Sequence, residues 1–155
     1  MRLLPLLPAC CAGALVTLAV LVSGCDEKLA DLAGPSPNLQ PTFASIQQEI
    51  FEKTDTSGRA ACTQCHSTTG GRTPSSGLNL NRDTAYAGLV GVLSRGKAGA
   101  VRVIAGDPDQ SYLVQKLEGK SGIVGERMPR TGGPYLTPGQ ITIIKRWIET
   151  GAKND

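Results

Sequence analysis

The sequence predicts an all-α domain that follows an export signal. Apolar residues recur at helical spacing in two segments, near residues 43–53 and 137–151. Between them, Cys62-Thr63-Gln64-Cys65-His66 brings two thiols beside the only histidine of the chain. Helices at both ends and a cofactor-type motif between them define the predicted architecture.

The N-terminus is predicted to be a signal peptide over residues 1–24. Arg2 precedes a nearly unbroken apolar run over residues 3–22. Val22-Ser23-Gly24-Cys25 resembles the lipobox of bacterial lipoproteins, which predicts cleavage before Cys25 and lipidation of that cysteine. Cleavage at Cys10 and an uncleaved membrane anchor are the alternatives, because the run is close to the ~20 residues that span a bilayer. We expect an exported, periplasm-facing protein of the bacterial cell envelope, anchored in the membrane through Cys25.

Residues 25–41 are predicted to form a lipidated, flexible tether, and residues 42–155 the folded domain. The tether contains Gly34-Pro35-Ser36-Pro37, which lacks apolar periodicity. Thr42-Phe43-Ala44-Ser45 leads into the first helix, which is expected to present Ile46, Ile50 and Phe51 on one face and to end near residues 53–54.

The middle of the domain is predicted to contain two further helices. Asp83 is expected to cap the first, which extends to Val90. Asp107-Pro108 is expected to begin the second, which ends at Gly119. Residues 101–104 fit a short extended stretch, and residues 70–76 and 121–135 fit loops.

The last helix has the strongest local signal. Thr137-Pro138-Gly139-Gln140 is a capping box with proline at the first helical position. The helix is expected to end at Gly151. Its apolar stripe consists of Ile141, Ile144, Trp147 and Ile148.

The Cys-x-x-Cys-His motif predicts covalent attachment of one haem c. Two thiols at this spacing can bind the two vinyl groups on one haem edge, so Cys62 and Cys65 are the candidate thioether residues. His66 lies where its imidazole can reach the iron as the proximal ligand. Zinc would need a fourth ligand from an isolated carboxylate, and a redox dithiol would need a βαβ setting.

Met128 is the candidate distal iron ligand. It is the only methionine after Met1 and lies in the polar segment Glu126-Arg127-Met128-Pro129-Arg130. A thioether ligand favours ferrous iron and raises the reduction potential. Core packing of Met128, with an open or water-bound iron, is the alternative.

Composition and charge agree with a small cofactor-dependent domain. Aromatic residues make up 4% of the chain and glycine occurs 19 times, so a core without a cofactor would be marginal. The net charge is +3 with no basic stripe, which argues against nucleic-acid binding. The arginines that flank the two motifs are candidates for pairing with haem propionates or for a docking face: Arg59, Arg72, Arg127 and Arg130.

Together these motifs resemble the class I (monohaem) cytochrome c family over residues 42–152. Gly106-Asp107-Pro108, Arg127-Met128-Pro129 and Trp147-Ile148-Glu149-Thr150-Gly151-Ala152 are similar to exported bacterial cytochrome c domains of the planctomycete type. The resemblance implies a cytochrome c fold, with crossing N- and C-terminal helices around one covalently bound haem. It implies contact of Ile46 and Ile50 with Ile144 and Trp147.

Two features depart from the family pattern. Leu78 occupies the place of the proline whose carbonyl accepts the ring N–H of the proximal histidine. Residues 54–61 separate the first helix from the haem motif by more than in the simplest members.

The expected function is single-electron transfer between redox protein partners by a membrane-tethered carrier that is not an enzyme. An open-iron haem enzyme or gas sensor, with peroxidase-like chemistry, is one alternative. The other is a haem-containing assembly subunit of a membrane redox complex.

Overall fold

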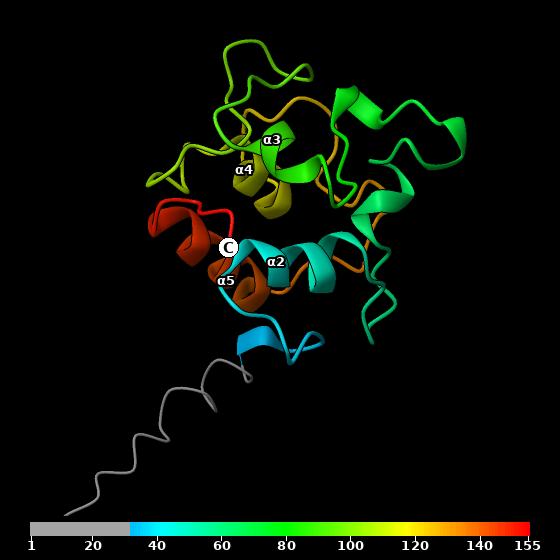
Figure 1. The fold of residues 1–155 in the computed structure, drawn as a ribbon, viewed down its shortest axis with the longest axis vertical. Helices are drawn as coiled ribbons and strands as arrows, with labels where there is room; N and C mark the ends of the chain where they lie inside the picture. Colours follow the sequence, from blue (N-terminus) through cyan, green and yellow to red (C-terminus); the bar gives the residue numbers. More distant parts are fainter. Residues whose placement is uncertain (1–31) are drawn as a thin grey trace, which may run out of the picture.

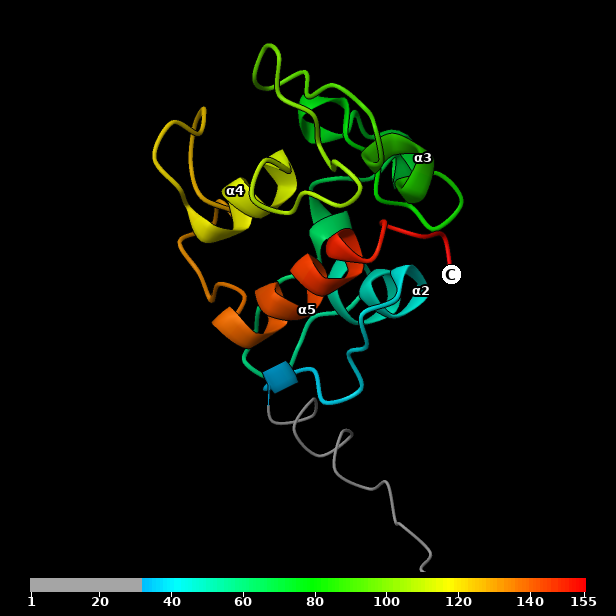
Figure 2. The same ribbon diagram turned by 90° about the vertical axis from the view of Figure 1, so that its left-hand side faces the viewer.

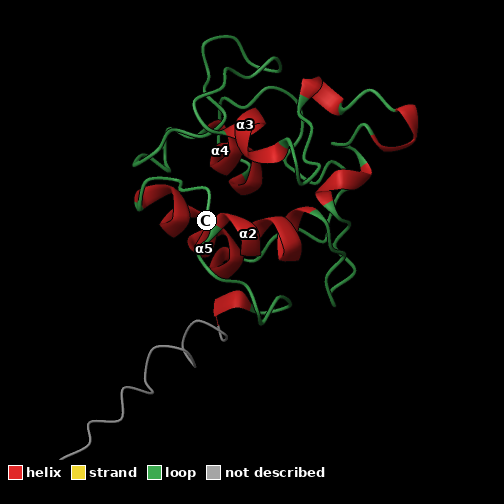
Figure 3. Cartoon of the chain, in the orientation of Figure 1, coloured by secondary structure: helices red, strands yellow, loops and turns green. Residues whose placement is uncertain are grey.

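The computed structural model describes residues 32–155, which form short helices connected by long loops (Figure 3). The predicted signal peptide and the lipidation of Cys25 lie outside the described residues and stay predictions. None of the helices within residues 32–155 has the length and apolar content that crossing a membrane requires. The helices with both ends among the described residues are α2 (Phe43–Ile46), the π-helix η1 (Gln47–Phe51), the 3₁₀-helices η2 (Cys62–Gln64), η3 (Thr69–Gly71) and η4 (Ser75–Gly77), α3 (Ala85–Leu89), α4 (Tyr112–Glu118) and α5 (Pro138–Glu149).

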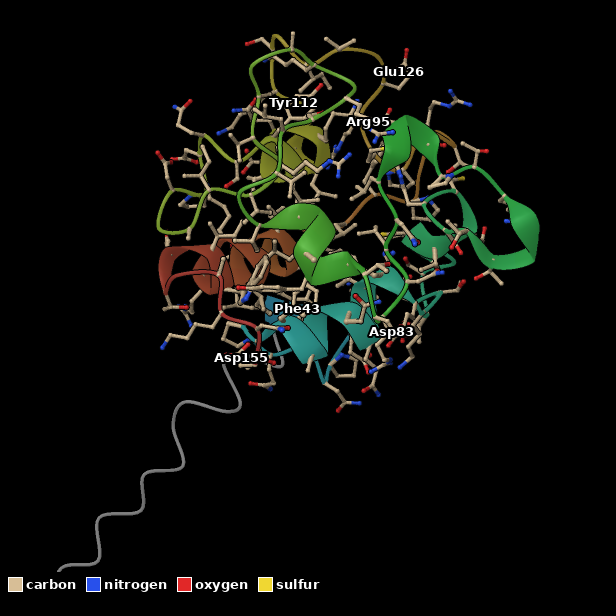
Figure 4. All side chains as sticks on the ribbon, turned by 45° about the horizontal axis from the view of Figure 1, so that its top comes forward. Phe43, Asp83, Arg95, Tyr112, Glu126 and Asp155 are labelled. Carbon is tan, nitrogen blue, oxygen red and sulfur yellow. The ribbon has the colours of Figure 1, made fainter. Side chains whose placement is uncertain are left out.

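The predicted first helix is confirmed and consists of α2 continued by η1. The Thr42 hydroxyl caps it by accepting a hydrogen bond from the Ser45 amide. The last residue of the chain also holds this helix start: the Asp155 carboxylate accepts from the Phe43 amide at 2.8 Å. Figure 4 shows Phe43 and Asp155 at the same end of the domain. The helix ends at Phe51, slightly earlier than predicted.

The predicted capping box of α5 is also confirmed. The Thr137 hydroxyl accepts from the Gln140 amide at 3.2 Å, and the Gln140 side chain accepts from the Thr137 amide at 2.9 Å. The four residues of the predicted stripe are buried, together with Ile143. Because Thr137 and Gln140 lie within one helical turn of each other, the local sequence is sufficient to define the start of this helix.

The core lies where α2 packs beside α5 (Figures 1 and 2). The Phe43 ring is centred 5.5 Å from the Trp147 indole and 5.1 Å from the Tyr86 ring. The residues expected to meet between the first and last helices belong to one buried cluster: Ile46, Ile50, Ile144 and Trp147. The architecture is mainly helical, while the cytochrome c fold itself stays a prediction.

The predicted starts of the two middle helices are wrong. Thr84, not Asp83, is the N-cap of α3, and the Asn81 carbonyl accepts from the Thr84 and Ala85 amides. Asp107 caps only a single turn, because its carboxylate accepts from the Gln110 amide and Ser111 then adopts an extended conformation. Helix α4 therefore begins at Tyr112. It ends at Glu118, and Gly119, the predicted stop, is its left-handed C-cap.

The extended stretch predicted over residues 101–104 is confirmed as short bridges. Val103 pairs with Val90 in parallel, and Val101 pairs with Leu93 in antiparallel orientation. The start of α4 is attached to this stretch, since the amides of Tyr112 and Leu113 donate to the carbonyls of Val101 and Arg102, both at 2.9 Å.

The folded part begins earlier than the predicted boundary at residue 42. Ala33 and Leu39 are 0% exposed and belong to the core cluster. The Gln140 side chain donates to the Ser36 hydroxyl at 3.0 Å. A Cβ atom at Gly139 would overlap the Leu32 carbonyl. Residues 32–41 therefore pack against the start of α5, so the predicted tether does not include them.

Candidate functional site

A cavity of about 270 Å³ lies between η1, the region after the Cys-x-x-Cys-His motif, and α4. Figure 4 shows Tyr112 and Glu126, two of its lining residues, at the end of the domain opposite Phe43. Cys62, His66 and Met128 all line this cavity. Its apolar wall consists of Ile50, Phe51, Leu78, Leu80, Leu89, Leu113 and Leu117.

A helical turn brings Cys62 and His66 to the same side of the chain. The His66 amide donates to the Cys62 carbonyl at 2.9 Å, across the i to i+4 spacing at which side chains are neighbours. The His66 carbonyl in turn accepts from the Leu80 amide at 2.8 Å. Cys65 is exposed and does not line the cavity. The structure thus brings three of the four predicted haem residues together and places Cys65 outside their cavity.

The first helix holds the motif through its last carbonyl groups. The Cys62 thiol donates to the Ile50 carbonyl at 3.5 Å, and the Thr63 hydroxyl donates to the Phe51 carbonyl at 3.1 Å. Arg59 also donates to the Ile50 carbonyl, at 3.2 Å. The longer connection over residues 54–61 therefore does not separate the motif from the first helix.

Arg59 forms a buried ion pair with Asp55. The Arg59 Nε donates to an Asp55 oxygen at 3.1 Å, and both side chains are 1% exposed. Burial tends to raise the pKa of Asp55, but the Ser57 hydrogen bond, together with the Arg59 backbone hydrogen bond and charge, outweighs it and lowers that pKa. Arg59 is consequently a structural residue and not a partner for a bound ligand.

The His66 imidazole is suited to metal coordination. Burial lowers its pKa, so the ring is neutral at neutral pH and retains a free lone pair. The backbone of Ser75 and of Leu78 opposes this decrease. Neither group forms a hydrogen bond of normal geometry with Nδ1, which is buried without a partner among residues 32–155. A buried nitrogen without a partner is unfavourable. In metal-binding histidines the ring nitrogen that does not bind the metal usually donates its N–H to a carbonyl or a carboxylate, and the Leu78 carbonyl does not make that contact here.

The two alternative interpretations of the Cys-x-x-Cys-His motif, a redox dithiol and a zinc site, receive little support. Burial raises the pKa of the Cys62 thiol, whereas a reactive dithiol requires a lowered one. Within residues 32–155, no three His, Cys, Asp or Glu side chains gather as a metal-binding group. A tetrahedral zinc site would need such a group.

Helix α4 holds the loop that carries Met128. The Tyr112 hydroxyl accepts from the Val124 amide at 3.0 Å, and the Lys116 ammonium donates to the carbonyls of Val124 and Glu126. The Met128 amide donates to the Lys116 carbonyl at 2.9 Å. Met128 is partly buried against the core cluster. Its position is therefore fixed by backbone contacts that the sequence pattern did not reveal.

The flanking arginines have different roles. Arg72 donates to the Gln64 carbonyl at the surface, and Arg127 lies over the Tyr135 ring at 4.1 Å. Arg130 lines the cavity. Sequence reasoning missed Arg102, which lines the same cavity from the extended stretch. Only its position next to Val101 and Val103 could have suggested that it is buried.

The donor set and the walls of the cavity fit a haem. Imidazole and thioether are ligands that haem iron accepts, and an apolar cavity suits the flat macrocycle. Cys62 would hold the group covalently from the cavity wall, with His66 and Met128 available to the iron, while Cys65 would have to reach the group from outside the cavity. Comparisons of the chain with protein-family models, with curated proteins and with solved structures found no match.

Proposed function

We propose that this chain is a membrane-tethered c-type cytochrome that transfers single electrons through one covalently bound haem. The observation that carries the proposal is that Cys62, His66 and Met128 line one largely apolar cavity. Met128 is far from the motif in sequence, and no local pattern requires them to meet. When bound, the haem supplies one-electron exchange between ferric and ferrous iron.

The residues of the chain have separate roles in this function. Cys62 and Cys65 retain the cofactor, and the neutral imidazole of His66 supplies the proximal ligand. The Met128 thioether supplies the distal ligand and favours the reduced state. The leucine-rich wall excludes water, which strengthens electrostatic interactions inside the cavity. Cys25 provides the predicted lipid anchor on the periplasmic side.

The test begins with the wild-type chain, produced in a bacterium that exports it and attaches haem to it. Intact mass should show one haem added covalently, and Cys62→Ala with Cys65→Ala should abolish that addition. A chain without covalent haem would refute the proposed function.

Met128 is tested by two substitutions. Met128→Leu keeps most of the side-chain volume and removes the sulfur, while Met128→Ala removes both. Both variants should lose the thioether-to-iron absorption band and have a lower reduction potential. A wild-type spectrum without this band would show that His/Met ligation is wrong.

A second candidate function is favoured by polar groups in the same cavity. Arg102, Arg130 and Glu126 also line it, and charged groups beside an open iron can provide acid-base catalysis. An open-iron haem enzyme should bind carbon monoxide rapidly in the reduced state and react with peroxide. Slow binding that requires displacement of Met128 supports the electron carrier instead.

A further inference from the structure

Arg102 is a buried cation without a counter-ion. The residue is 8% exposed and lines the cavity. Its guanidinium donates to the Gly88 carbonyl at 2.7 Å and to the Ser76 carbonyl at 3.1 Å. No carboxylate within residues 32–155 lies at ion-pairing distance from it. Its charge is therefore not neutralised by the described part of the chain.

A second guanidinium increases the local positive charge. Burial lowers the pKa of Arg102, and the positive charge of Arg95 acts in the same direction. Arg95 lies against the segment of Ser76 and Gly77, to which Arg102 also donates, since a Cβ atom at Gly77 would lie 2.8 Å from the Arg95 guanidinium. Figure 4 shows Arg95 at the same end of the domain as Tyr112 and Glu126.

The other cations of the cavity, Lys116 and Arg130, differ from Arg102. Arg130 is exposed to solvent. Lys116 is engaged with the carbonyls of Val124 and Glu126, so it has a structural role in the Met128 loop. Arg59, a fully buried arginine outside the cavity, has Asp55 as its counter-ion. Arg102 is the one that combines burial, a position in the cavity wall and a missing counter-ion among the described residues.

A charge in this situation favours an anionic ligand. Leaving a buried charge unpaired is strongly destabilising, and linking two backbone carbonyls requires donors but no charge. A guanidinium has five N–H donors in a planar fork that matches a carboxylate. The two bonds to Gly88 and Ser76 leave donors for such a group.

We propose that Arg102, supported by Arg95, binds a carboxylate group of the ligand that fills this cavity. This inference rests on the proposed function, under which the carboxylate is one of the two haem propionates. Arg102 is then a cofactor-binding residue that neutralises the propionate inside the cavity. It also keeps that propionate ionised at neutral pH, because an adjacent arginine favours the charged form of a carboxyl group.

The test compares Arg102→Met with the wild-type protein carrying its haem. Arg72→Met is the matched control, because Arg72 also donates to a backbone carbonyl but does not line the cavity. The first readout is the resonance Raman band of propionate bending, which reports hydrogen bonding to the propionates. This band should shift in Arg102→Met and stay unchanged in Arg72→Met.

The second readout is the pH dependence of the reduction potential. The potential falls with rising pH across the pKa of a propionate, because oxidised iron favours its ionised form. In Arg102→Met the pH range over which the potential falls should move to higher pH, because the propionate should bind its proton about tenfold to a thousandfold more tightly. A role limited to holding Gly88 and Ser76 would lower stability without moving either readout, and that result would overturn the inference.

Two further measurements keep the inference testable if Arg102→Met does not fold. Arg102→Lys retains the charge without the fork, so it should shift the Raman band while changing the pH profile less. The wild-type protein alone should have one propionate with a strongly lowered pKa. Two propionates with ordinary pKa values would contradict the inference. Absence of covalent haem would refute the proposed function itself, which separates the two failures.

Discussion

Replacing Arg59 by methionine should strongly destabilise the domain. The change leaves Asp55 buried without its partner, and both side chains are 1% exposed. Breaking a buried pair in this way costs about 3–5 kcal/mol. Arg59 also donates to the carbonyls of Glu49, Ile50, Lys53 and Ala60. We therefore expect a loss near 5 kcal/mol, which is large beside the about 5–15 kcal/mol that stabilises a typical domain.

Urea denaturation of the haem-loaded protein, followed by circular dichroism, measures this loss. Arg82→Met is the control, because it breaks an exposed pair with Glu52 and should cost about 0–1 kcal/mol. The double variant Asp55→Asn with Arg59→Met leaves no unpaired buried charge and should recover part of the stability. Equal losses for Arg59→Met and Arg82→Met would refute the reasoning.

The same ion pair predicts how stability depends on acid. The pKa of Asp55 is lower in the folded protein than in the unfolded chain, so its ionised form favours folding. This contribution is complete above the unfolded pKa of about 3.9 and is lost as the pH falls through the lower folded pKa. The stability difference between wild type and Asp55→Asn should therefore shrink below about pH 4. A difference that stays constant down to pH 2 would contradict this account.

Two other substitutions test the supports of the site and of the N-terminal segment. Tyr112→Phe removes the hydrogen bond from the Val124 amide, which is worth about 1 kcal/mol. Under the proposed function, cyanide should then displace Met128 from ferric iron about fivefold faster, because the loop that carries Met128 is held less strongly. An unchanged rate would show that α4 does not hold this loop. Gly139→Ala should lower the melting temperature, because its Cβ would overlap the Leu32 carbonyl. Gly88→Ala, with room for a Cβ in α3, should be neutral or stabilising by up to about 1 kcal/mol. A Gly139→Ala variant as stable as Gly88→Ala would mean that residues 32–41 do not pack there.

Local signals in the sequence predicted helix α5 and the first helix. The capping box of Thr137 and Gln140 joins residues of one helical turn, so no distant part of the chain is needed to form it. The start of α4 was mispredicted for the opposite reason. Asp107 does cap a turn, but Ser111 donates to the Asp107 carbonyl and accepts from the Ile104 amide. These bonds hold Ser111 extended, and no helix propensity reports them.

The candidate ligands could be predicted because their chemistry is rare in this chain. One histidine and one methionine after Met1 leave few choices for a haem iron. Burial of the wall residues could not be predicted in the same way. Arginine is normally a surface residue, so the place of Arg102 in the cavity depends on bridges between distant residues. The packing of Leu39 against the core likewise contradicts the loop-like composition around it.

Helix α4 explains how distant parts of the sequence form one cavity. At its start, the Leu113 amide donates to the Arg102 carbonyl. One turn later, the Lys116 carbonyl accepts from the Met128 amide. Arg102, proposed to bind a propionate, and Met128, proposed to bind the iron, are therefore both hydrogen-bonded to the backbone of this short helix. Because close-packed interiors transmit strain, a displacement of α4 would affect both groups. The helix thus couples the positions of Arg102 and Met128 in the cavity.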